Sequence, residues 1–134
     1  MLKSTDARLI INNRIRSFPQ FDPMRINWTN QPNFKIPLEG LWARVTIQYS
    51  DSQSAGFFKE VLSRDFGIIN IQCFARKGTW DTNLIAYAQA WRDHFHHYRS
   101  GDFEVTMTNA PTEATDDVQG DFVMSLVRVE FRIN

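Results

Sequence analysis

The chain has 134 residues, of which 43% are hydrophobic and 22% are charged. A chain of this length can bury a core without disulfides or metal, and its many large apolar side chains exclude a disordered polypeptide. Fifteen basic and fifteen acidic residues cancel, so the overall charge excess typical of nucleic-acid-binding proteins is missing. The composition predicts a single folded domain, residues 1–134, without specific nucleic-acid binding.

The only cysteine of the sequence, Cys73, has no internal disulfide partner and stands in an apolar run, which predicts a packing role. No run approaches the roughly 20 apolar residues of a membrane helix, and the N-terminus lacks the apolar segment of a signal peptide. We therefore expect a protein that is made in the cytoplasm and has no membrane partner.

The first predicted element is a helix that begins at a cap within residues 4–6 and stops at Pro19. Its expected apolar side consists of Leu9, Ile10, Ile11, Ile15 and Phe18. The other faces carry Arg8, Arg14 and Arg16. Because the total charge is neutral, we interpret these arginines as a solvated face and not as phosphate ligands.

Residues 19–40 are rich in proline and predict an extended connection, with a short edge strand at residues 25–28. Residues 42–49 alternate cleanly between apolar and polar side chains and predict a strand. A second strand is expected at residues 57–65, paired through a tight turn with a third at residues 67–75.

A long amphipathic helix should follow, with Asp81 or Thr82 as its cap and a glycine stop at Gly101. Its apolar stripe consists of Leu84, Tyr87, Ala88, Trp91, Phe95 and Tyr98. Residues 103–108 and 122–133 alternate as strands, and residues 110–120 predict an exposed polar loop. The order predicts an α+β fold with an antiparallel or mixed sheet and both helices packed on one face.

The side chains that most suggest chemistry are His94, His96 and His97, because imidazoles are common zinc ligands. His94 and His97 lie three residues apart on the helix, with Asp93 close by, but the paired-histidine signature with its glutamate is missing. Nucleophile-elbow, phosphate-loop and dinucleotide-binding motifs are missing too. We expect no catalytic, metal or cofactor site, and therefore no enzyme.

Several motifs follow one another along the chain. After the first helix, Asn30-Gln31-Pro32-Asn33-Phe34 leads into Trp42-Ala43-Arg44-Val45-Thr46-Ile47. The central strand Gly67-Ile68-Ile69-Asn70-Ile71-Gln72 precedes Lys77-Gly78 and a helix that closes on Trp91-Arg92-Asp93-His94-Phe95. The last strand carries Val127-Arg128-Val129-Glu130-Phe131. In this order the motifs resemble the phage tail terminator-like proteins of long, flexible-tailed phages and their prophages.

The resemblance implies a structural virion protein that forms a ring, six-fold in the well-understood members, on the end of the tail tube. Such a ring stops tube polymerisation and offers a surface for the head. Its partners would be further copies of the chain, the major tail tube protein and head–tail connector proteins, with DNA passing through the ring. The protein would then reside in the tail after assembly in the host bacterial cytoplasm.

If subunits join in a ring, exposed charges are the expected contacts, since weak polar joints keep the ring from forming ahead of the tube. The interface residues predicted on this basis are Lys59, Glu60, Arg64, Arg128, Glu130 and Arg132. Three loop acids, Glu113, Asp116 and Asp117, are expected to face the lumen or a neighbour and to repel DNA phosphates.

Two alternatives remain open from the sequence. The chain can be another head–tail connector or minor tail protein of the same virion. It can also be a small binding domain or enzyme with a pocket between the long helix and the sheet and the histidines at its mouth.

Overall fold

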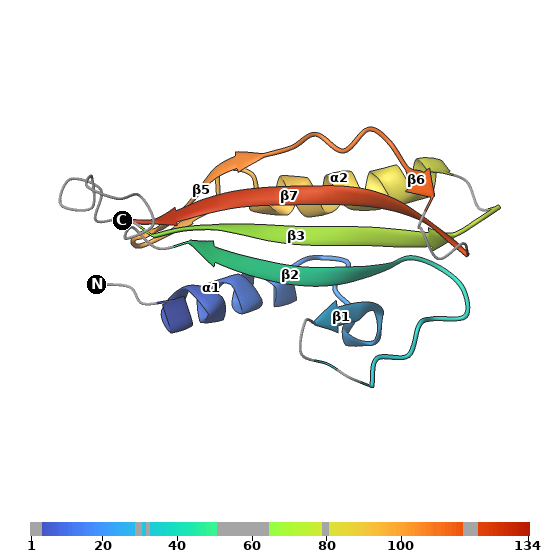
Figure 1. Cartoon of the computed structure of the whole chain (residues 1–134), viewed down its shortest axis with the longest axis horizontal. Coiled ribbons are helices and arrows are strands. Elements are labelled where there is room, and N and C mark those ends of the chain that lie inside the picture. The colour runs from blue at the N-terminus through green and yellow to red at the C-terminus, as the bar shows by residue number, and fades with distance from the viewer. Residues whose placement is uncertain (1–3, 29–30, 32, 51–64, 79–80, 117–120) are drawn as a thin grey trace.

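The computed structural model describes residues 4–28, 31, 33–50, 65–78, 81–116 and 121–134. Its helices are α1 (Ser4–Arg16) and α2 (Asp81–Phe95), and a short 3-10 turn, η1, spans Pro23–Arg25. The strands are β1 (Ile26–Trp28), β2 (Trp42–Ser50), β3 (Asp65–Arg76), β4 (Arg99–Ser100), β5 (Phe103–Thr108), β6 (Thr115–Asp116) and β7 (Phe122–Ile133). Figure 1 shows the long strands lying side by side with the helices along one side of them.

The strands of the described residues form one sheet in the order β1-β2-β3-β7-β5-β4, and β6 pairs with β7 beyond the end of β5. All pairs of the described strands are antiparallel except β1 with β2, which is parallel, so of the predicted antiparallel or mixed sheet the structure has the mixed form. At the centre Ile71 lies between Val45 of β2 and Val127 of β7. This register places the apolar residues of all three long strands on the same face, because side chains alternate along each strand.

Both helices cover that face, which we call the inner face, and the predicted α+β fold is confirmed. α2 lies along β7 and β3, whereas α1 lies beside β2 (Figure 1). The core combines side chains of both helices and the sheet, among them Ile11, Ile15, Phe18, Val45, Ile69, Ile71, Leu84, Trp91, Phe95, Phe103, Val129 and Phe131. Cys73 is buried in it, as its place in an apolar strand predicts.

Trp91 connects the two helices. Its side chain has no exposed surface, and its ring stacks on Phe18 with 3.8 Å between centroids and 16° between planes. Tyr87, one turn earlier in α2, meets the same Phe18 edge to face at 6.1 Å. Aromatic pairs in such geometries add to the hydrophobic contribution of burial. The segment after α1 is thereby fixed against α2.

The opposite, outer face of the sheet also buries an aromatic group, which the sequence pattern does not reveal. Trp42 is only 2% exposed, although it lies on the same face of β2 as the exposed Arg44. Its ring stacks on Phe74 at 4.3 Å and meets Phe122 edge to face at 5.7 Å. Three neighbouring strand ends therefore share a small aromatic cluster.

Gly67 of β3 leaves room for the large side chain of its β7 partner Phe131. A methyl group at this position would overlap the ring of Phe131 and stand 2.8 Å from the carbonyl oxygen of Gln48. The Phe131 ring also contacts Phe103 at 5.0 Å and Tyr49 at 5.8 Å. The glycine is therefore needed for space, because the ring of Phe131 occupies the place of a side chain.

Several element boundaries differ from the sequence prediction. β3 runs without interruption from Asp65, so the tight turn predicted just before Gly67 is wrong, and residues 57–64 of the predicted strand lie outside the described residues. α2 ends at Phe95 because His97 takes a left-handed backbone conformation with φ 61°, and Tyr98 follows outside the helix. Leu9, predicted to be apolar core, is 61% exposed, since Ala7 and Ile11 occupy the buried side of α1.

Replacing Trp91 with alanine should lower the free energy of unfolding by roughly 3–5 kcal/mol, because it empties a large buried site. Urea unfolding of both proteins measures the difference. Asp93→Ala on the exposed side of the same helix is the control and should change stability by less than about 0.5 kcal/mol. A loss below about 1 kcal/mol for Trp91→Ala would contradict the core position of this ring.

Gly67→Ala should destabilise the protein by about 1–3 kcal/mol through overlap with the Phe131 ring. In the background of Phe131→Ala the same glycine change should cost less, because the ring that it overlaps is gone and only the close contact with the Gln48 carbonyl oxygen remains. Urea unfolding again measures the stabilities. Additive losses in this double-mutant cycle would show that the Phe131 side chain is not the reason for a glycine at position 67.

Candidate functional site

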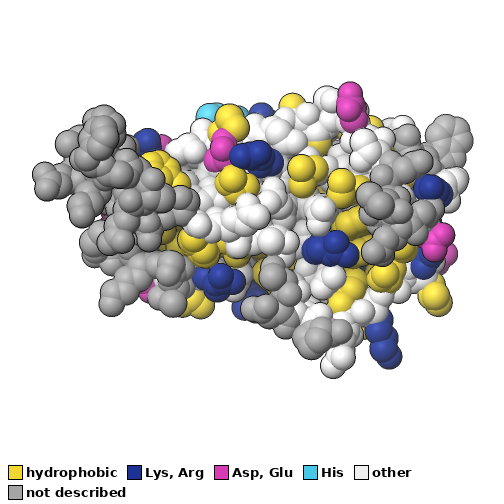
Figure 2. All heavy atoms as spheres, in the orientation of Figure 1, with side chains coloured by type: hydrophobic (Ala, Val, Ile, Leu, Met, Phe, Trp, Pro, Cys, Tyr) yellow, Lys and Arg dark blue, Asp and Glu magenta, His cyan; other side chains and the backbone are white. Residues whose placement is uncertain are grey.

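The predicted interface charges of β7 lie on the outer face, where the described residues place no helix. Figure 2 shows this face, with hydrophobic and basic side chains interspersed over the strands. Arg128 lies 3.5 Å from Glu130, and Arg132 donates to both carboxylate oxygens of Glu104 at 3.2 and 3.3 Å. The hydrogen bond from Arg132 lowers the pKa of Glu104. The structure therefore gives these β7 charges partners within the subunit.

The remaining predicted interface residues, Lys59, Glu60 and Arg64, lie outside the described residues. On the outer face, exposed apolar side chains accompany the charges, with Phe66 39% and Leu126 38% exposed. The register separates them, because Phe66 pairs with Arg132 whereas Leu126 pairs with Gln72, so each is a single exposed apolar group beside charged or polar neighbours. Sequence reasoning missed these two side chains because it treated the charged residues alone.

The acidic segment 109–116 is held along β7. The Asn109 side chain donates to the carbonyl oxygen of Leu126 at 2.8 Å and accepts from the amide of Arg128 at 2.7 Å, which continues the pairing where β5 ends. Gln89 of α2 donates to the carbonyl oxygen of Pro111, whose side chain is buried. The described part of the predicted exposed loop is therefore held by these contacts, and β6 adds a short strand at Thr115–Asp116.

The predicted loop acids are placed only in part. Glu113 is exposed on this segment, and Asp116 belongs to β6, where it pairs with Val123 of β7. Asp117 lies outside the described residues. Glu113 and Asp116 are therefore brought to the same edge of β7, on the side of the sheet that β5 and β6 form.

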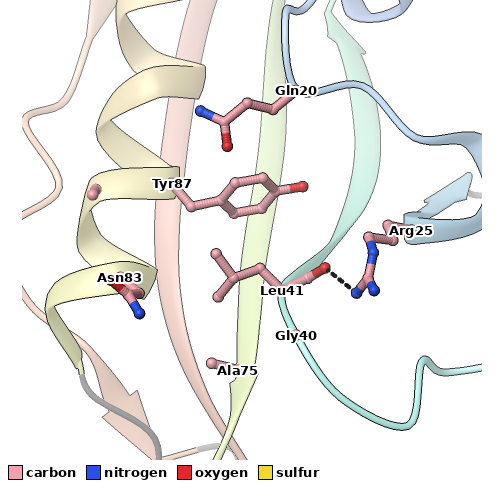
Figure 3. Close-up of a pocket in the computed structure, with 8 residues that line it drawn as sticks. Gln20, Arg25, Gly40, Leu41, Ala75, Asn83 and Tyr87 are labelled. Atoms are coloured by element: carbon pink, nitrogen blue, oxygen red, sulfur yellow. Dashed lines mark hydrogen bonds between the residues drawn. The ribbon is translucent and has the colours of Figure 1, made fainter.

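A pocket of about 580 Å³ lies between the start of α2 and the sheet (Figure 3). Its walls come from Leu41, Ala75, Ala86 and Tyr87, and polar groups of Gln20, Arg25 and Asn83 stand at its border. Burial raises the pKa of Tyr87 to about 12, so its hydroxyl stays protonated over the physiological range. The volume falls within the range of small-molecule pockets.

Two arginines hold the connection that forms one wall of this pocket. Arg25 donates to the carbonyl oxygens of Glu39 and Leu41, each at 3.0 Å, and Arg76 donates to that of Leu38 at 2.8 Å. Gly40 has a φ of 86°, and a methyl group there would stand 2.8 Å from the Arg25 guanidinium. Sequence reasoning missed these arginines, since their carbonyl partners are not visible in a residue pattern.

The histidines do not border the pocket; they lie at the other end of α2, so the predicted arrangement with histidines at its mouth is wrong. His94 Nε2 lies 2.6 Å from the carbonyl oxygen of Arg14, and Arg14 Nε donates to the carbonyl oxygen of His94 at 3.0 Å. Both carbonyls belong to the last turns of their helices, and that of Arg14 also accepts from the amide and hydroxyl of Ser17 at 3.2 and 2.7 Å. This reciprocal pair caps both helix ends, and Arg14 is not merely a solvated residue.

Because a carbonyl only accepts, His94 Nε2 carries a proton in this pair. Burial lowers the pKa of His94, and the nearby Arg14 cation acts in the same direction. His96 contacts the Thr108 hydroxyl at 2.9 Å. The histidine cluster therefore joins α2 to α1 and β5.

Within the described residues, no group of three or more histidine, cysteine or acidic side chains has the geometry to hold a metal ion. Burial also raises the pKa of the Cys73 thiol, which disfavours a thiolate nucleophile. None of the described helices combines the length and apolar character needed to cross a bilayer. The sequence matches no protein-family model and no curated protein.

His94→Gln should reduce the loss of stability on going from pH 8 to pH 5. A histidine with a lowered folded-state pKa contributes stability above its unfolded value near 6.5 and loses it as pH falls toward the folded value. Glutamine keeps a donor for the Arg14 carbonyl but does not titrate. Urea unfolding at both pH values tests this, with His97→Gln as control; an unchanged pH dependence would contradict it.

Proposed function

We propose that this protein is a structural virion subunit that assembles into a ring, six-fold by resemblance, at the end of a phage tail tube. The ring would end tube polymerisation and provide the surface to which the head joins. In this proposal the protein is not an enzyme, and its partners are copies of itself, the tail tube protein and the head–tail connector.

The observation that carries this proposal is the one-sided construction of the fold. Both helices cover the inner face, and the outer face of β2, β3 and β7 exposes Phe66 and Leu126 among charged side chains. A ring subunit needs a rigid body with extensive surface left for neighbours, and a sheet backed on one face by helices supplies both. The order of sequence motifs described above supports the same assignment.

Acidic residues suit a subunit that lets DNA pass, because carboxylates repel phosphates and weaken adhesion. Glu113 is exposed on a segment that is fixed against β7 and α2, so its charge is held in place. Placement of this segment toward the lumen or a neighbouring subunit belongs to the proposal. Another head–tail connector of the same virion would use the same features.

A second candidate function rests on the pocket between α2 and the sheet. Its apolar walls and its polar border of Gln20, Arg25 and Asn83 are typical of a site for a small, mostly apolar molecule with polar substituents. This is the small binding domain considered from the sequence, without the histidines. A thermal-shift screen of small molecules, with Ala86→Trp to fill the pocket as control, separates it from a ring subunit.

Ring formation should depend on protein concentration and salt. Joints made of exposed charges are weak singly, so the dilute protein should be a monomer or small oligomer and should form closed rings when concentrated or placed on tail ends. Screening acts over about 8 Å at physiological ionic strength, so raising salt should disfavour the ring. Sedimentation velocity over a range of concentrations and salt, with electron microscopy of tail tubes, measures both effects.

A protein that stays monomeric at every concentration and also fails to bind tail tubes would overturn the ring proposal. Lysozyme at matched concentration and salt, which has no expected affinity for tube ends, serves as the negative control for tube binding.

A further inference from the structure

We infer that neighbouring copies of this chain join head to tail, with the basic outer side of α1 in one copy against the acidic segment 109–116 of the next. This joint rests on the proposed ring and specifies its contact. It differs from the predicted β7 contacts, since Arg128 and Arg132 already pair with Glu130 and Glu104 in the same subunit.

The first half of the joint is the exposed side of α1. Arg8 and Arg16 are exposed and lie over the rings of Tyr49 and Trp28, at 5.6 and 5.9 Å from the ring centroids. Neither guanidinium forms an ion pair with a carboxylate in the part of the chain that the structure describes. Leu9, 61% exposed between them in sequence, adds an apolar group to the same helix.

The second half is the edge of β7 that β5, β6 and segment 109–116 form. Residues 109–116 carry Glu113 and Asp116 and no lysine or arginine. Glu113 is exposed on the part fixed by Asn109 and Gln89. Met107 of β5 is 52% exposed and supplies an apolar group near this edge.

The two halves lie at opposite edges of the sheet: α1 lies beside β2 below it, and the segment runs along the upper side of β7 (Figure 1). A contact between two copies of either edge would bring like charges together, which is unfavourable. A contact between different edges pairs opposite charges. In such a pair of subunits, one keeps its α1 side unbound and the other keeps its acidic segment unbound. Such a heterologous joint repeats from subunit to subunit and closes into a ring when the rotation permits.

The strength of the joint suits assembly on a template. Exposed ion pairs contribute little each and weaken with salt, so two subunits alone bind weakly. In a closed ring every subunit makes two joints, and alignment on a tube end raises the effective concentration of neighbours. The charge pattern thus favours the ring only where several subunits are already held together.

A charge swap tests this joint. Arg16→Glu places an acidic residue on α1 against Glu113 of the next copy, and Glu113→Arg places a basic residue against Arg16 of the next copy. Each variant alone should need about tenfold more protein to assemble than the wild type, because every joint places like charges together. An equimolar mixture should recover wild-type assembly, since alternating subunits pair opposite charges at every joint.

Sedimentation velocity and native mass spectrometry measure assembly and reveal alternating subunits by mass. Lys77→Glu, a charge reversal at the end of a central strand, is the control and should assemble like the wild type. Circular dichroism checks folding, and Arg8→Glu replaces Arg16→Glu if that variant unfolds. Wild-type assembly by the single variants, or no recovery in the mixture, would overturn this joint.

The outcomes separate the joint from the proposed function. Rings of the wild type that the charge swap does not affect would overturn the joint and leave the tail-ring proposal intact. Recovery in the mixture, with no binding of the wild type to tail tubes, would support the joint and overturn the tail role.

Discussion

The burial of one sheet face by both helices is the constraint on which the rest of this structure depends. Trp91 has no exposed surface and stacks on Phe18, so α2 and the segment after α1 are fixed against each other by one buried contact. Because interiors are closely packed, this contact leaves little freedom in how the two helices are placed. Arg14 and His94 reinforce it, since each caps the helix of the other.

What the helices do not cover is the surface on which a function of assembly must rest. The outer face exposes apolar side chains between charges, and the charges of β7 are already paired with neighbours in the same chain. The exposed arginines of α1 and Glu113 on the opposite edge are not engaged in such ion pairs among the described residues. The charges at the two edges are therefore better placed to bind a neighbouring subunit, because pairing within the subunit lowers the electrostatic gain available to a neighbour.

The tertiary structure gives the histidines a structural role that differs from the ligand role suggested by the sequence. From the sequence they are a group of possible ligands at a helix end, where imidazolium would favour the helix dipole. In the fold, His94 is a donor to a carbonyl of another helix, and His96 contacts Thr108. The partners lie 80 and 12 residues away, respectively, so no local spacing indicates them.

The sequence by itself determined the strands at residues 42–50, 103–108 and 122–133, the long helix, and the α+β class, because alternation and helical periodicity record which side chains must be buried. Tertiary structure alone decided the parallel pairing of β1, the continuous start of β3, the fixing of segment 109–116 and the exposure of Leu9. It also decided the pocket and the arginine contacts with backbone carbonyls. These features depend on contacts between residues far apart in the chain. A residue pattern indicates which side chains are buried, but it does not indicate which distant backbone groups they meet.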